Sequence, residues 1–425
     1  MNVAVVGAGP AGALLAFHLA SDGATVTLFD ASHPREKPCG GGVTAKALAL
    51  LPKAPAHDPL PGRRVQACRF ESGEGDAVDV ALTRPVVVAS RLELDGWLLR
   101  RAVQAGARHV TKRVTAVGDK GVTAGGVLHP CDVVVGADGA GSLVRRTFLT
   151  PTPPPRLAMA AGWFAPGTAP MVVRFTPGRA GYLWLFPRPD HVGVGICAPL
   201  LAVPTRDLLA RLEREVARSF PALVNEVAGT ARERDSLPRS APGGLGGATV
   251  APPSSGRYAH TIPSPSADPS SIHEIAGERW ALVGDAAALA DPITGEGIYY
   301  ALRSAALLAE TLRDEGSPRR YPQHALDDFG ADLLKAAALH ARFFAPGFAR
   351  RMIRYAGRSR AIREVVGDLV LGDQGYVGLK RRLLRAGPRF ALESARFALG
   401  FPPGPALGPP PGPGQAISGG SGGRR

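Results

Sequence analysis

The chain has 425 residues, of which 45% are hydrophobic and 20% charged, as is typical of a globular protein with two or three domains. No run of about eighteen apolar residues is present, which argues against a spanning helix, and no basic segment precedes the apolar start, so we expect no secretory signal. The four cysteines form no CxxC pair, so we expect no metal site or disulfide framework and a reducing cytoplasm.

The net charge of +14 is concentrated near the C-terminus. Residues 331–400 hold fourteen Lys and Arg against five Asp and Glu, and they are also rich in Leu, Phe, Ile and Ala. A basic, apolar, helix-forming segment suits an anionic membrane surface, and it is equally typical of a solvated helical face. Both interpretations stay open, the first implying peripheral contact at the inner face of the membrane. No recognition motif accompanies the charge, so we expect no nucleic-acid partner.

In chain order, the first predicted elements are a strand, a helix and a second strand. Val3–Val6 reads as a buried strand, Ala13–Ala20 as a helix ending near Gly23, and Thr25–Phe29 as the next strand, which together make a βαβ unit. Beyond them we expect strands at 86–89, 133–135 and 280–283, helices at 92–105, 208–217 and up to 311, a rigid linker at 150–155, antiparallel strands between 157 and 197, a long loop or lid at 236–271, and a disordered tail from 401.

A glycine motif connects the first strand to the first helix. In Gly7-Ala-Gly9-Pro-Ala-Gly12, the tight turn needs Gly7, Gly9 lets a pyrophosphate approach the backbone, and Gly12 lets the helix pack on the strand. The helix N-terminus offers N–H groups to the phosphates, and Asp30, eighteen residues after Gly12, can accept hydrogen bonds from ribose hydroxyls. The motif predicts a dinucleotide site but does not separate NAD from FAD.

Further Asp- and Gly-containing turns follow later strands and favour a flavin. An Asp-Gly pair comes just past the strand at 133–135, a Gly-Asp pair ends the strand at 280–283, and a Gly-rich turn then opens a helix. The carboxylate in the second turn can hold ribityl hydroxyls, and N–H groups in the third can meet the flavin pyrimidine carbonyls. The residues that we assign to the cofactor on this basis are Asp138, Gly139, Asp285, Gly295, Gly297 and Ile298.

Three further motifs make the resemblance specific. The chain resembles the p-hydroxybenzoate hydroxylase-type flavoproteins and, within that superfamily, the geranylgeranyl reductase family. The resemblance spans about residues 1–310 and rests on Lys37-Pro38-Cys39-Gly40-Gly41-Gly42, Ser90-Arg91-Leu-Glu-Leu-Asp95 and Tyr182-Leu-Trp184-Leu-Phe186-Pro187. Asp30 departs from the pattern, since the family more often has Glu there, and so does the Pro-rich insert.

The resemblance implies roles for these residues. Cys39, Gly40 and Gly42 would lie beside the isoalloxazine ring, Arg91 would contact FAD, and the aromatic side chains of Tyr182, Trp184 and Phe186 would line a prenyl pocket. Val114 also belongs to the expected cofactor set. From the residues alone, Cys39 could assist proton delivery or position the substrate, or it could be a small residue tolerated where the backbone approaches FAD. Tyr182 and Trp184 could likewise be ordinary core aromatics.

The expected fold class is α/β, with a Rossmann-like FAD-binding domain that is split in sequence. We assign this domain to residues 1–60, 88–150 and 279–330, and an antiparallel β-sheet substrate domain to 61–87 and 156–278, including the insert at 236–271. Residues 331–400 form a basic C-terminal helical region, and 401–425 form the tail.

The activity implied by the resemblance is reduction by FAD of isolated C=C bonds in a polyprenyl (geranylgeranyl-type) lipid, quinone or related isoprenoid. An unactivated alkene has no carbonyl to polarise, so this chemistry needs a long apolar cavity that excludes water. The alternative is a flavin-dependent monooxygenase or halogenase of the same superfamily. The sequence has no second fingerprint for NAD(P)H, so the electron donor, NAD(P)H or a ferredoxin-like carrier, stays open.

Overall fold

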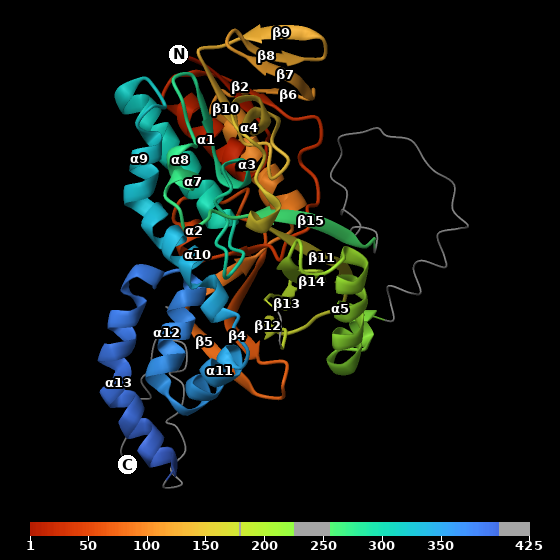
Figure 1. The fold of residues 1–425 in the computed structure, drawn as a ribbon. Helices are drawn as coiled ribbons and strands as arrows, with labels where there is room; N and C mark the ends of the chain where they lie inside the picture. Colours follow the sequence, from red (N-terminus) through yellow and green to blue (C-terminus); the bar gives the residue numbers. More distant parts are fainter. Residues whose placement is uncertain (178–179, 225–255, 399–425) are drawn as a thin grey trace, which may run out of the picture.

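A five-stranded parallel sheet carries the N-terminal motif. The chain is described here by a computed structural model over residues 1–177, 180–224 and 256–398 (Figure 1). Helices α1 (Pro10–Ser21), α3 (Arg91–Gln104) and α8 (Ile298–Glu315) pack together beside the sheet. In spatial order its strands are β16 (Trp280–Leu282), β10 (Val133–Gly136), β1 (Asn2–Val6), β2 (Thr25–Phe29) and β6 (Arg108–Val110). The predicted Rossmann-like arrangement, assembled from distant parts of the sequence, is confirmed.

An eight-stranded sheet lies beside the first. Its strands are antiparallel apart from the pair β12–β4, and they run in the order β15 (Tyr258–Pro263), β11 (Leu157–Pro166), β14 (His191–Pro199), β13 (Tyr182–Pro187), β12 (Val172–Phe175), β4 (Arg63–Glu71), β5 (Ala77–Val88) and β3 (Gly42–Val43). Two edge strands thus come from far-apart segments, one just after the N-terminal βαβ unit and one after residue 255.

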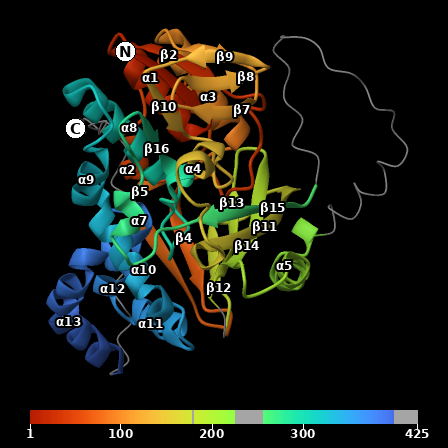
Figure 2. The ribbon, with the colours of Figure 1, turned by 45° about the horizontal axis from the view of Figure 1, so that its top comes forward.

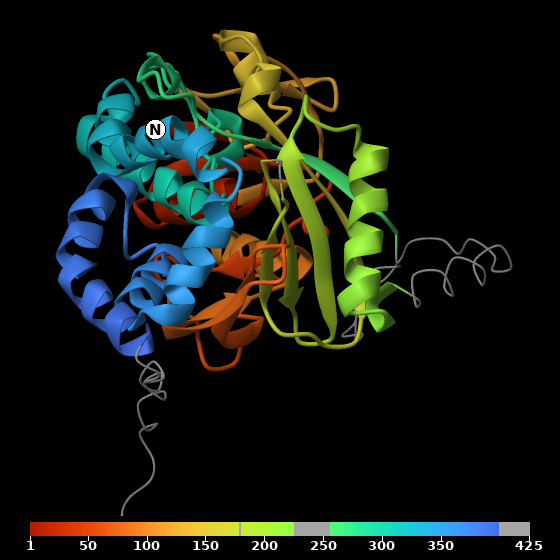
Figure 3. The same cartoon turned by 60° about the horizontal axis from the view of Figure 1, so that its bottom comes forward.

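Amphipathic helix α5 (Thr205–Ser219) covers the outer face of this sheet, on the side away from the C-terminal helices (Figure 3). Leu208, Leu212 and Val216 recur every fourth residue, so they share one face of the helix, and all three are buried in a core that also contains strands β11 and β14. A small three-stranded sheet, β7 (Val114–Gly118), β8 (Gly121–Ala124) and β9 (Val127–Pro130), lies at the other end of the molecule.

The C-terminal helices lie against strands β4 and β5 (Figures 1 and 2). They are α10 (Ala331–Phe343), α11 (Phe348–Arg358), α12 (Arg360–Leu371) and α13 (Tyr376–Ala398), and they follow the shorter elements α9 (Tyr321–Ala325) and η4 (Leu326–Gly330). Helices α11 and α12 contact β5, while α13 packs on α10 and α12. Within the described residues, no helix has the length and apolar character needed to cross a bilayer.

One sequence expectation needs correction. We expected a long loop or lid over residues 236–271, but within that range β15 pairs in antiparallel register with β11, from Tyr258 opposite Gly162 to Pro263 opposite Leu157. A short helix, α7 (Ser270–His273), follows. The high Pro, Gly and Ser content of the whole range hid the segment Tyr-Ala-His-Thr-Ile, whose partner strand lies about a hundred residues earlier. The rest of the expected loop, residues 236–255, and the tail from 401 lie outside the described residues.

Candidate active site

A single large cavity joins the two sheets and the C-terminal helices. Its volume is about 1780 Å³, enough for a dinucleotide cofactor together with a long apolar substrate. Of the site residues expected from the sequence, only Gly12 does not line it. The others are Gly7, Gly9, Asp30, Cys39, Gly40, Gly42, Arg91, Val114, Asp138, Gly139, Tyr182, Trp184, Phe186, Asp285, Gly295, Gly297 and Ile298.

The three glycines of the first motif have different surroundings. A β-carbon on Gly7 would lie 2.3 Å from the Ala137 carbonyl oxygen, and one on Gly12 would lie 1.8 Å from the Gly7 oxygen, so both positions are closed by packing. A β-carbon on Gly9 would meet nothing nearer than His33 Nε2 at 3.7 Å. Gly9 also begins α1, whose N-terminus has no side-chain cap. These features fit a cofactor phosphate approaching at Gly9.

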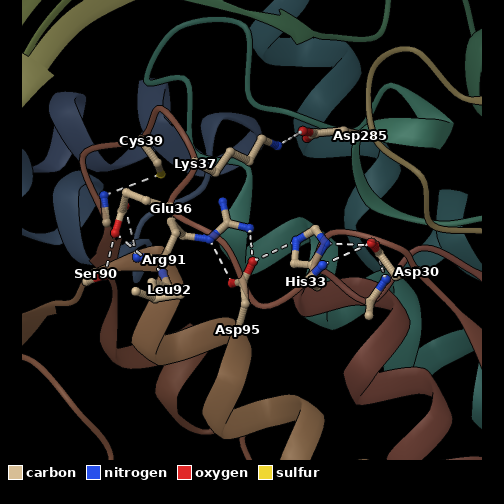
Figure 4. A network of polar contacts seen from close by, with 12 residues as sticks. Asp30, His33, Glu36, Lys37, Cys39, Ser90, Arg91, Leu92, Asp95 and Asp285 are labelled. Atoms are coloured by element: carbon tan, nitrogen blue, oxygen red, sulfur yellow. Dashed lines mark hydrogen bonds and ion pairs between the residues drawn. The ribbon is translucent and has the colours of Figure 1, made fainter. Parts of the chain in front are cut away.

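Asp30 is held by its own chain. Its carboxylate accepts the Ala8 N–H at 2.9 Å, the Ser32 N–H at 2.7 Å and the Ser32 hydroxyl at 2.9 Å, and it also pairs with His33 Nδ1 at 2.7 Å (Figure 4). Burial raises the pKa of Asp30, but the hydrogen bonds from His33 and Ala8 outweigh it and leave the pKa well below its usual value. The carboxylate is therefore ionised, and Ser32 and His33, which also line the cavity, share its position beside the expected ribose.

Arg91 forms an ion pair with a carboxylate of its own helix. An arginine at a helix N-terminus is unfavourable unless an anion lies near it. That anion is Asp95, one turn along α3, with two contacts of 2.8 Å from the guanidinium to its carboxylate (Figure 4). His33 Nε2 lies 3.2 Å from the same carboxylate, so His33 bridges Asp30 and Asp95. Arg91 lines the cavity, and the pair with Asp95 already accounts for its charge.

Lys37 and Asp285 join two parts of the cofactor region. The Lys37 ammonium lies 2.9 Å from the Asp285 carboxylate, across 248 residues of sequence (Figure 4). Burial raises the pKa of Asp285, but the charge and hydrogen bond of Lys37 outweigh it and leave the pKa below its usual value. Asp285 is therefore ionised at neutral pH and can only accept hydrogen bonds.

Asp138 lines the cavity and also caps a short helix. One of its carboxylate oxygens accepts the Leu143 N–H at 2.6 Å and thereby holds the start of α4 (Leu143–Phe148). Its other oxygen is buried without a hydrogen-bond partner among the described residues. Burial raises the pKa of Asp138 despite these bonds. Asp138 therefore both lines the cavity and fixes the start of α4.

The glycine loop at 39–42 is fixed from behind by Arg188. This arginine is fully buried, donates to the Cys39 carbonyl at 2.9 Å, and pairs with Glu36 at 3.0 Å. Glu36 also accepts a hydrogen bond from the Ser90 hydroxyl and the Arg91 N–H. The Cys39 sulfur accepts the Gly41 N–H at 3.3 Å.

Aromatic side chains of β13 close over this loop and over the turn at 294–297. A β-carbon on Gly40 would lie 2.7 Å from the Phe186 ring, and one on Gly295 would lie 2.7 Å from the Tyr182 oxygen. The Tyr182 hydroxyl donates to the Thr294 carbonyl, and the Trp184 ring lies 6.1 Å from that of Tyr182. Two glycine turns and an aromatic wall therefore meet at one place in the cavity.

Beyond the aromatic wall the cavity is largely apolar. It continues between the eight-stranded sheet and the C-terminal helices, where it is lined by Cys68, Phe70, Val86, Met171, Val173, Phe175, Leu339, Phe343, Met352, Ile362, Val365, Val366, Leu369 and Val370. His260, on β15, also faces it, and burial together with the nearby Lys37 charge lowers the pKa of His260 to about 4. That histidine is uncharged at neutral pH, consistent with a low-polarity cavity.

Sequence reasoning missed several residues of the network in Figure 4 and behind it. They are His33, Glu36 and Arg188, and each adjoins a motif that was recognised: two precede the Cys39 loop, and Arg188 follows Pro187 directly. The sequence offered one signal for these residues, a charged side chain next to a recognised motif. It did not show which residue each charge would pair with, because Arg188 and Glu36 are 152 residues apart.

Comparison with known proteins agrees with this geometry. Residues 5–46 match the NAD(P)-binding Rossmann-like domain. The chain is 30% identical to menaquinone reductase of Mycolicibacterium smegmatis over 347 residues, covering 74% of this chain and 77% of that protein. It is 28% identical to geranylgeranyl diphosphate reductase of Rhodobacter capsulatus over 321 residues, or 70% of this chain and 71% of that one.

Among solved structures, a geranylgeranyl bacteriochlorophyll reductase-like protein from Thermoplasma acidophilum superposes with a TM-score of 0.68 at 19% identity, covering 90% of this chain and 98% of that one. Flavin-dependent halogenases and an oxygenase also share the fold, so the fold by itself leaves the reaction open.

The glycine loops, the carboxylates at the strand ends and the aromatic wall define an FAD-dependent oxidoreductase. Together with the similarity to menaquinone reductase, they show that the chain belongs to the geranylgeranyl reductase family of flavoproteins.

Proposed function

We propose that the protein saturates isolated C=C bonds of a polyprenyl lipid, quinone or related isoprenoid. The observation that carries the proposal is the continuity of the cavity, in which the loops suited to FAD open directly into a long apolar space. A substrate that fills such a space needs little more than an extended hydrocarbon chain. The names of the two relatives, a menaquinone reductase and a geranylgeranyl diphosphate reductase, agree with that class.

We assign the cofactor to the residues of the glycine loops and strand ends. Gly9 and the start of α1 would receive the phosphates, Asp30 and its neighbours the adenosine ribose, and Asp285 the ribityl chain. The start of α8 at Gly297 and Ile298 has no side-chain cap, so its N–H groups would be free to stabilise negative charge on the flavin pyrimidine. Reduced flavin supplies a hydride when bound there.

The chain itself would place the alkene and keep water away. Tyr182, Trp184 and Phe186 form the wall against which the double bond would lie. The Cys39 thiol, which accepts the Gly41 N–H, lies in the loop beside that position, and Arg188 holds the backbone of that loop at the Cys39 carbonyl. Adding a hydride to one alkene carbon requires a proton at the other, and Cys39 is our candidate to position the substrate or to deliver that proton. Its replacement by Ser tests this role.

The electron donor would reduce the flavin without binding to a second Rossmann site on this chain. The match to the NAD(P)-binding Rossmann-like domain covers the same loop that we assign to FAD. NAD(P)H binding transiently, or a ferredoxin-like carrier, are both compatible with one nucleotide fold. Stopped-flow reduction of the oxidised holoenzyme by NADH, NADPH and reduced ferredoxin would decide between them.

The proposed activity is tested by product analysis. Dithionite-reduced holoenzyme is incubated without oxygen with prenyl diphosphates, menaquinone and prenylated glycerol lipids, and the products are examined by mass spectrometry. We expect at least one compound to gain two hydrogens. A parallel incubation under ¹⁸O₂ addresses the monooxygenase alternative, which predicts incorporated ¹⁸O and no gain of hydrogen. No saturated product from any prenylated compound would contradict the proposal.

A further inference from the structure

The helical end of the cavity has a cationic border. Lys335 and Arg342 on α10, Arg351 on α11 and Lys380 on α13 all line the cavity, and all four are exposed. None of them forms an ion pair within the part of the chain that the structure describes. The acidic residues that line the cavity, Asp30, Asp138, Asp285 and Glu296, all belong to the cofactor loops and the turn before α8. The four cations therefore face solvent without an ion-pair partner among the described residues.

Large apolar side chains share this border. Val377, Leu383 and Leu384 on α13 line the cavity and are 61%, 39% and 69% exposed. A solvated helical face would direct such residues inward and leave only polar side chains outside. Here exposed leucines and cations surround the same opening. We refer to Lys335, Arg342, Arg351, Val377, Lys380, Leu383 and Leu384 as the cavity rim.

The rim is contributed by helices that contact one another. Helix α13 packs on α10 and on α11, and α10 packs on α11. Figures 1 and 3 show these helices together on one side of the molecule, with α13 outermost and α5 on the opposite side of the eight-stranded sheet. The rim thus forms part of one outer surface.

We propose that the cavity rim docks on an anionic lipid bilayer, so that the cavity opens onto the membrane. The cations would meet lipid phosphates, while Leu383 and Leu384 enter the boundary between headgroups and acyl chains. A hydrophobic substrate could then pass from the bilayer to the aromatic wall without crossing water. This last consequence rests on the proposed function, whereas the docking does not.

The docking is tested with the FAD-loaded protein and vesicles, without any substrate. Co-sedimentation is compared between phosphatidylcholine vesicles and vesicles that contain phosphatidylglycerol as well. We expect binding to the anionic vesicles only, and a marked loss when the salt concentration is raised, since exposed charges are screened within about 10 Å at 0.1 M salt.

Matched variants locate the surface. Replacing two rim cations, Arg342→Glu with Lys380→Glu, should weaken vesicle binding at least about tenfold, since each cation near such a surface is worth several-fold in affinity. The control, Lys120→Glu with Arg214→Glu, changes the net charge equally at exposed positions that do not line the cavity, and it should bind nearly as wild type. Leu383→Asn with Leu384→Asn should weaken binding without any change in charge.

Three results would overturn the proposal: no binding to anionic vesicles, an equal loss in the control, or no loss in the rim variants. If the rim variants lose affinity only for a soluble prenyl diphosphate, measured by calorimetry, the cations bind a substrate headgroup and not a bilayer. Because sedimentation needs no turnover, an inactive protein that still binds vesicles would contradict the proposed function alone.

Discussion

Gly9 differs from the neighbouring motif glycines because the space over its α-carbon opens into the cavity. Its φ of −68° is available to any residue, so a side chain there would not strain the backbone. We expect Gly9→Val to fold with a near-normal Tm but to lose at least about tenfold in FAD affinity, since the side chain would occupy the path of the phosphates. Fluorescence titration of apoprotein with FAD measures the loss. Gly118→Val, at an open and exposed position on β7, serves as the control.

His33 should make stability depend on pH. Burial lowers its pKa, but the Asp30 and Asp95 carboxylates outweigh burial and raise the pKa above the ordinary value of 6.5. A raised folded-state pKa contributes stability that is complete below about pH 6.5 and is lost as pH rises through the folded-state value. The Tm difference between wild type and His33→Asn should therefore be largest near pH 6 and shrink toward about pH 9. A difference that is constant or grows with pH would contradict this network.

The site could be predicted from sequence wherever its chemistry is local in the chain. Gly9 and Gly297 each lie within a strand–turn–helix segment, so their positions at helix starts followed from spacing alone. The charges that hold the loops could not be predicted, because Lys37 finds Asp285 and Arg188 finds Glu36 only after folding. Arg91 is an intermediate case: a cation at a helix start needs a nearby anion, and its partner, Asp95, lies within the same helix.

At the scale of elements, helix α5 packs on the eight-stranded sheet and does not line the cavity. Leu212 is fully buried between the helix and the sheet. We expect Leu212→Ala to lower the free energy of unfolding by about 2–5 kcal/mol through lost contacts and a residual cavity. The flavin absorbance of the folded variant should be unchanged. Urea denaturation measures the loss, with Leu201→Ala, at an exposed position, as the control. A cost below about 0.5 kcal/mol would contradict the packing described here.

Elements with a strong internal pattern were predicted closely, and elements that depend on a partner were not. Strand β2 has the predicted bounds Thr25–Phe29, and α3 begins one residue before the expected helix. Strand β15 was missed because its pairing with β11 provides the backbone hydrogen bonds, while the sequence around it is dense in Pro, Gly and Ser. The two-residue strand β3 depends in the same way on β5.

At the scale of the whole molecule, the chain places the cofactor loops at one end of the cavity and the basic helices at the other. Residues 331–400 left two interpretations open at the level of sequence, a membrane surface or a solvated face. In the structure some of those cations border the cavity beside exposed leucines, an arrangement that composition cannot reveal. The structure thus shows where part of this charge lies. The vesicle experiments distinguish between a membrane surface and a solvated face.

The central claim is that a flavin held by these loops delivers its electrons to a polyprenyl chain in the adjoining cavity. The most direct test is an anaerobic titration of dithionite-reduced holoenzyme, freed of excess dithionite, with the lipid that gives saturated product. The account predicts that the visible absorbance of oxidised flavin returns in proportion to the lipid added. One flavin should be oxidised for each double bond saturated. Absorbance that stays low with every prenylated compound and returns only when oxygen is admitted would contradict the account.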